Sequence, residues 1–68
     1  MAMEMYVVQL GKMGMNGFGL IETSNVLVSN LDGAKLRTAD LLKTRGSQLG
    51  ANKAKLLGDG GNVIFEFP

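Results

Sequence analysis

Apolar and polar residues alternate along much of the first half of the chain, with the two-residue period of a β-strand. Residues 4–10 (EMYVVQL) combine this alternation with tyrosine and valine, which favour strands, and predict a first strand. Residues 17–23 and 26–31 predict a second and a third strand. The glycine-containing stretch 11–16 is expected to form a turn or a bulge, and the pair Ser24–Asn25 is expected to form a tight turn.

The period changes in the middle of the chain, where residues 34–45 carry leucine and alanine at helical spacing. We expect a short helix there, preceded by a turn at Asp32–Gly33. Thr38 is a candidate for its N-terminal cap. Gly46 is a candidate for its end, because two basic residues precede it in the last turn.

The last third of the chain admits two interpretations. Residues 47–57 fit either a helix capped by Ser47 or a strand in which lysine alternates with apolar residues. The glycine-rich stretch 58–61 is typical of a reverse turn, and residues 62–67 (NVIFEF) predict a strand. A hairpin of 51–57 with 62–67 accounts for all of these residues, and we favour it.

The predicted order is therefore β-β-β-α-β-β within one domain spanning residues 1–68. Five strands of this size can bury their apolar faces by curling into a barrel, with glycines at the bends. This order predicts a mainly β fold, a small five-stranded OB-like barrel with one short helix. Sm-like and SH3-type barrels remain open, as does a β-grasp arrangement if 47–57 is helical.

The amino-acid composition excludes several kinds of catalytic and metal site. The 68 residues include no cysteine and no histidine, which excludes disulfides, thiolate or zinc-finger metal sites, Ser-His-Asp triads and thiol nucleophiles. So short a chain also has little room for a substrate pocket. We therefore expect a protein that is not an enzyme and needs no cofactor.

The length and net charge of the chain indicate which partners it is expected to have. Ordering costs about 1.5 kcal/mol per residue, so a chain of this length has little net stability from its own core. This favours association with other copies, and residues 4–10 could pair as an edge strand. Seven basic against six acidic residues give a net charge of +1. No apolar run could span a membrane and no secretory signal pattern opens the sequence, so a cytoplasmic location is expected.

Two stretches carry a family resemblance. Residues 16–21 (NGFGLI) resemble the first nucleic-acid motif of cold-shock domains, Lys-Gly-Phe-Gly-Phe-Ile, and residues 26–30 (VLVSN) stand where the second motif, Val-Phe-Val-His-Phe, follows on the next strand. The resemblance covers about the first half of the chain. It implies an OB-type barrel on which unpaired bases stack on aromatic side chains. Leucine, serine and asparagine replace the family's other aromatic and histidine positions, so Phe18 is the remaining platform.

The first functional hypothesis is therefore weak binding of single-stranded RNA or DNA without catalysis. The alternative is a structural module of the same fold that self-associates and binds no nucleic acid. For Phe18 an ordinary barrel or interface role competes with base stacking, and for the basic residues of 35–45 a solvated helix face competes with phosphate binding. The residues expected to contact nucleic acid are Tyr6, Lys12, Phe18, Leu20, Leu27, Ser29, Lys35 and Arg37.

Overall fold

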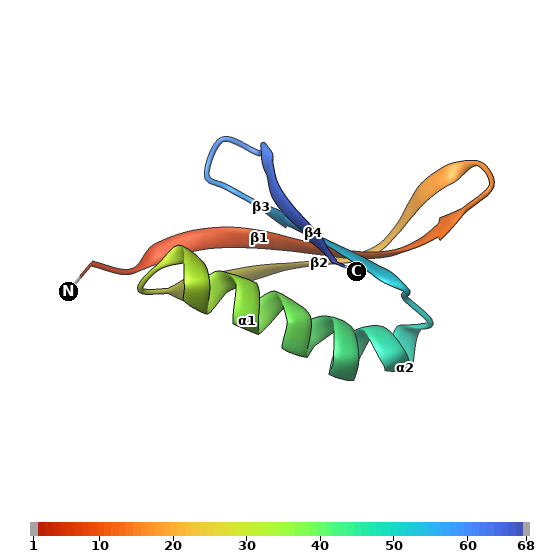
Figure 1. Cartoon of the computed structure of the whole chain (residues 1–68), viewed down its shortest axis with the longest axis horizontal. Helices are drawn as coiled ribbons and strands as arrows, with labels where there is room; N and C mark the ends of the chain where they lie inside the picture. Colours follow the sequence, from red (N-terminus) through yellow and green to blue (C-terminus); the bar gives the residue numbers. More distant parts are fainter. Residues whose placement is uncertain (1, 68) are drawn as a thin grey trace.

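A computed structural model describes residues 2–67 and contains one antiparallel sheet with helical segments packed on one of its faces (Figure 1). The four strands lie in the order β2-β1-β3-β4. The helical segments are continuous and form one 19-residue rod. The elements are β1 (Glu4–Gly14), β2 (Gly17–Val28), α1 (Leu31–Leu41), the π-helical η1 (Leu42–Gly46), α2 (Ser47–Leu49), β3 (Lys53–Leu57) and β4 (Val63–Phe67).

The prediction of antiparallel strands with one helical segment is confirmed. The fold is α+β rather than mainly β, and the predicted five-stranded barrel is not found among residues 2–67. The predicted second and third strands are one continuous strand, β2. Ser24 and Asn25, expected to form a turn, pair with Val8 and Val7 of β1. This pairing with β1 overrides the local turn preference of the two residues, so β2 runs straight through them. The sheet therefore stays open, with β2 and β4 at its edges, and β1, predicted as an edge strand, lies inside it.

The helix begins earlier than predicted. Asn30 is its N-cap, and the side-chain oxygen of Asn30 accepts a hydrogen bond from the backbone N–H of Gly33 at 2.8 Å. This cap draws Asp32–Gly33, predicted as a turn, into the first helical turn. Thr38 is not a cap but a fully buried residue within α1, and its hydroxyl donates to the carbonyl of Ala34 at 2.7 Å.

The helix also ends later than predicted. Gly46 has helical backbone angles and is buried, and the space beside its Cα is bounded by Leu42 and Ala51. Its missing side chain therefore serves close packing rather than termination. The rod instead ends at Gly50, which adopts the left-handed conformation (φ +79°) common at helix C-termini.

The C-terminal hairpin is confirmed, with bounds slightly inside the predicted ones: β3 pairs with β4 from Ala54–Phe67 to Leu57–Val63. The turn between them contains Gly61 at φ +83°. The N–H of Gly58 donates to the carbonyl of Asn62 at 2.9 Å and closes the turn.

The core lies between the helix and the central strands. Its fully or nearly fully buried apolar side chains are small: two leucines, two valines and two alanines. They come from β1, β2, β3 and α1, and Tyr6, Val28 and Phe67 are among the half-buried residues that pack around them. The buried set is Val8, Leu10, Val26, Ala34, Ala54 and Leu56.

The stretch 11–16 was expected to form a turn or a bulge, and the β1–β2 pairing does contain a β-bulge between Leu10 and Gly11. Gly11 itself continues β1 into a long hairpin with β2 that projects from the body (Figure 1). A Cβ atom at Gly11 would overlap both the Gly19 carbonyl oxygen and the ring of Phe18. Phe18 therefore covers the glycine from a diagonal position on the neighbouring strand, an arrangement that fixes the register of glycine-rich hairpins.

We predict that Gly11→Ala destabilises the protein by about 1–3 kcal/mol, because the added methyl group must displace backbone as well as the Phe18 ring. Gly14→Ala is the matched control, since nothing lies within 4 Å of a Cβ atom there. Chemical denaturation of both variants measures the difference. Equal free energies of unfolding would contradict the close approach at Gly11.

Candidate functional site

The helix covers only one face of the sheet, and we call the other the open face (Figure 1). Side chains alternate between the two faces along each strand, so the neighbours of the core residues point to the open face. The pairing register arranges them in rows across the sheet. These rows are Leu27–Met5, then Asn25–Val7–Leu57–Val63, then Thr23–Gln9–Lys55–Glu66, then Leu20–Gly11–Lys53.

The first part of the open face is apolar. Leu27 and Met5 lie directly opposite each other and are 55% and 53% exposed. In the adjoining row Leu57 on a central strand is 9% exposed, while Val63 at the edge is 46% exposed. The helix does not cover this face, and the apolar surface that reaches solvent is that of Met5, Leu27 and Val63, while neighbouring side chains bury Leu57.

The rest of the open face carries polar and charged side chains beside Phe18 and Leu20, and both of its lysines already have partners. The Lys53 ammonium lies 3.1 Å from a carboxylate oxygen of Glu66. The Lys55 ammonium lies over the Phe18 ring, 4.4 Å from its centroid, in a cation–π contact. Phe18 therefore has Gly11 against its distal atoms and a lysine over one face of its ring. On the face of the ring that Lys55 occupies, a base could stack only by displacing the lysine.

The β2 edge contains a single charged residue, Glu22. The Arg45 guanidinium near the end of the helix binds this carboxylate with two hydrogen bonds, of 3.0 and 3.1 Å. These bonds lower the pKa of Glu22 and raise the pKa of Arg45. The acid is thus held on the helix side of the sheet, and the outer edge of β2 carries uncharged side chains.

The structure separates the predicted nucleic-acid residues. Phe18 and Leu20 share one end of the open face, and Leu27 lies at its other end. The basic members lie elsewhere: Lys35 and Arg37 belong to α1, in the layer behind the sheet, where the Lys35 ammonium contacts the ring of Phe65. Of the remaining members, Tyr6 lies on the helix side of β1 and Ser29 lies between β2 and α1. Lys12 pairs with Gly19, so it lies on the same hairpin as Phe18 and Leu20 but on its other face.

The cold-shock resemblance places residues 16–21 and 26–30 on two successive strands. In the structure both stretches lie on or beside the single strand β2. Val26 and Val28 of this match point into the core. Ile21 does not: it is the residue left unpaired at a β-bulge and is 43% exposed.

Sequence reasoning missed the residues that surround Phe18, namely Gly11, Lys53 and Lys55. The alternation of lysine with apolar residues in 53–57 was a usable signal, because it places both lysines on the same face of a strand. Their position next to Phe18 follows only from the pairing of β3 with β1.

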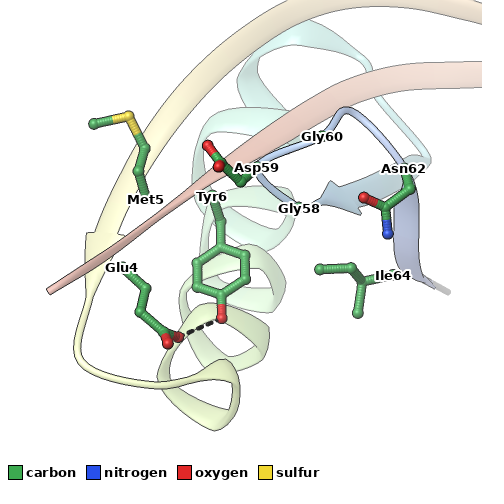
Figure 2. A pocket seen from close by; sticks show the side chains of 8 residues that line it. All are labelled: Glu4, Met5, Tyr6, Gly58, Asp59, Gly60, Asn62 and Ile64. Atoms are coloured by element: carbon green, nitrogen blue, oxygen red, sulfur yellow. Dashed lines mark hydrogen bonds between the residues drawn. The ribbon is translucent and has the colours of Figure 1, made fainter.

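A shallow hollow of about 580 Å³ lies where the start of β1 meets the turn between β3 and β4 (Figure 2). Within it the Tyr6 hydroxyl donates a hydrogen bond of 2.6 Å to a Glu4 carboxylate oxygen. This bond, with partial desolvation and the negative charge, raises the pKa of Tyr6. The lining residues are Glu4, Met5, Tyr6, Gly58, Asp59, Gly60, Asn62 and Ile64.

The ionisable residues that line the hollow are Glu4, Tyr6 and Asp59. No lysine or arginine side chain lies among the lining residues to pair with the two carboxylates. Across residues 2–67, acidic side chains do not gather in threes as a metal site would require. In the same range no helix combines the length and apolar character needed to cross a membrane.

Comparison with family models, curated proteins and solved structures found no match for this chain.

We predict that Tyr6 titrates above its ordinary pKa of about 10 and that Glu4→Gln moves the pKa back toward that value. Because the folded state favours the neutral phenol, this interaction supports folding below pH 10 and is lost as the pH rises through the folded-state pKa. Tyr6 is the only tyrosine and there is no tryptophan, so phenolate absorbance reports this group alone. Because a glutamine side chain at this position can still accept the hydrogen bond, Glu4→Ala is the variant that removes it, and an unchanged titration curve in Glu4→Ala would contradict the hydrogen bond.

Proposed function

We propose that this chain is a non-catalytic module that associates with further copies of itself through its sheet. One observation carries the proposal: of the ten large apolar side chains that are exposed among residues 2–67, only Leu36 belongs to the helix. The other nine lie on the strands or beside their ends. The solvent-exposed apolar surface is thus concentrated on the sheet layer, where the open face and two edge strands lack a covering element.

The energetics support association. The core of this chain has six small or medium apolar side chains, a modest set for a domain of 68 residues. Burial of apolar surface contributes roughly 25 cal/mol per Å². A second copy placed on the sheet layer removes from water the apolar side chains that the single chain leaves exposed. The near-neutral net charge of +1 opposes such contact only weakly.

Binding of single-stranded nucleic acid is a second candidate, favoured by Phe18, Lys53 and Lys55 meeting on one face of the sheet. Three features rank it lower. Phe18 is the single aromatic ring there and already contacts Lys55. Lys53 is paired with Glu66. The basic residues of α1 lie in the other layer, where they cannot extend a phosphate track along the open face.

Self-association predicts that the average mass in solution rises with protein concentration. Sedimentation equilibrium over a wide concentration range measures this directly. Leu36→Lys, which changes an exposed leucine on the outer surface of the helix, is expected to leave the association unchanged. A mass that stays at one chain throughout the range overturns the proposed function.

We further predict little binding of a labelled single-stranded oligonucleotide at low salt. Phe18→Ala is expected to bind it no more weakly than the wild-type protein does. Phosphate contacts weaken steeply with salt, whereas apolar self-association does not. Binding that falls with added salt and is reduced together in Phe18→Ala and Lys55→Ala would instead support the nucleic-acid function.

A further inference from the structure

We propose that the second copy is bound edge to edge, with β2 of one chain pairing antiparallel to β2 of the other about a two-fold axis at Asn25. This inference rests on the proposed self-association and specifies its surface. The partner is another copy of this chain, and the contact is a continuation of the sheet.

The β2 edge is the least protected part of the molecule. Soluble proteins usually block an edge strand with lysine, proline, short length or an inward-pointing charge. β2 is the longest strand, with 12 residues, and contains no lysine, arginine or proline. Its one acid, Glu22, is bound by Arg45. Leu20, Ile21 and Leu27 are 43–55% exposed along it.

The other available surfaces are less suited to a second copy. β4 has only 5 residues, its pairing with β3 is irregular, and Glu66 near its end is in an ion pair. The open face has an apolar part, but a face-to-face contact broad enough for a stable dimer would also cover Lys53, Lys55 and Glu66. Desolvating these charges opposes such a contact. Along the β2 edge the one charged group is Glu22, and Arg45 already neutralises it.

The position of the regular segment of β2 determines the register between the two copies. Its pairing with β1 is regular over residues 22–28 and is interrupted at the bulge by Ile21. Asn25 is the middle of this regular segment, so a two-fold axis there brings it opposite its own copy. Thr23 then faces Leu27 of the second copy on the open face, and Ser24 faces Val26 on the helix face. Pairs of like charge do not arise in this register.

This arrangement closes on itself. Each chain uses its β2 edge once, so two chains form one continuous antiparallel sheet, with both helices on the same side and β4 at both outer edges. The stoichiometry is therefore two, whereas pairing of β2 with β4 would produce open-ended assemblies.

The absence of cysteine from the sequence allows a direct test with single-cysteine variants. Facing Cα atoms in an antiparallel pair lie about 4.5–5.5 Å apart, within the range that a disulfide spans. Under mild oxidation, Asn25→Cys is expected to form a covalent dimer at least ten times faster than the control variants Leu36→Cys on the outer helix surface and Val63→Cys on the other edge. Faster cross-linking of either control, or equal rates for all three, overturns the β2 register.

A second comparison does not depend on oxidation. Leu27→Lys adds the type of charge that blocks edge strands, while Leu36→Lys makes the same change at a position that is 75% exposed on α1. Circular dichroism confirms that each variant is folded. We expect Leu27→Lys to raise the dimer dissociation constant at least tenfold and Leu36→Lys to leave it unchanged.

The outcomes separate the two proposals. A concentration-dependent dimer that is insensitive to Leu27→Lys and is not cross-linked through Asn25→Cys overturns the β2 interface and leaves self-association standing. A chain that is monomeric at every concentration overturns both. Assemblies that grow beyond two chains also overturn the closed β2 pair.

Discussion

The close contact between the helix and the central strands determines most of the surface of this protein. The helix meets the sheet through Ala34 and Thr38, both fully buried, and Gly46 leaves room for Leu42 of its own helix and Ala51 of the following loop. Small residues allow one rod of helix to lie close along one face, with the buried Thr38 hydroxyl satisfied inside the helix. A single helix covers a single face, however. The opposite face and both edges of the sheet consequently have no covering element within residues 2–67, and apolar side chains such as Leu20 and Leu27 are exposed there.

The elements that depend on local signals could be predicted from the sequence, and those that depend on pairing could not. The C-terminal hairpin was predictable because glycines separate two short runs of strand-forming residues. Ser24 and Asn25 gave an equally clear local signal for a turn, yet their pairing with β1 overrides it. Gly46 likewise suits a helix end by composition, but its packing neighbours make it part of the helix. Merging two expected strands into one removed the fifth strand that a barrel requires.

The candidate site was predictable only in part, for the same reason. Phe18 does lie on a sheet face with its ring directed over the strand surface, but the residues that define its environment come from β1 and β3. Its contact with Lys55 joins residues far apart in sequence, and no local pattern around Phe18 indicates it. The basic residues of 35–45 were correctly placed on a helix. Only the topology determines that this helix packs behind the sheet, so that its charges and Phe18 lie in different layers.

The ion pair between Glu22 and Arg45 connects the fold to the proposed assembly. Without a partner, Glu22 would place a negative charge beside its symmetry-related segment, where an edge contact would have to desolvate it. Arg45 instead binds the carboxylate from the helix layer with two hydrogen bonds, and the lowered pKa keeps it ionised and bound as the pH falls toward its ordinary titration range. The helix thereby neutralises the only charge of β2. In the proposed dimer, the same layer that buries one face of the sheet also leaves its longest edge uncharged and able to pair.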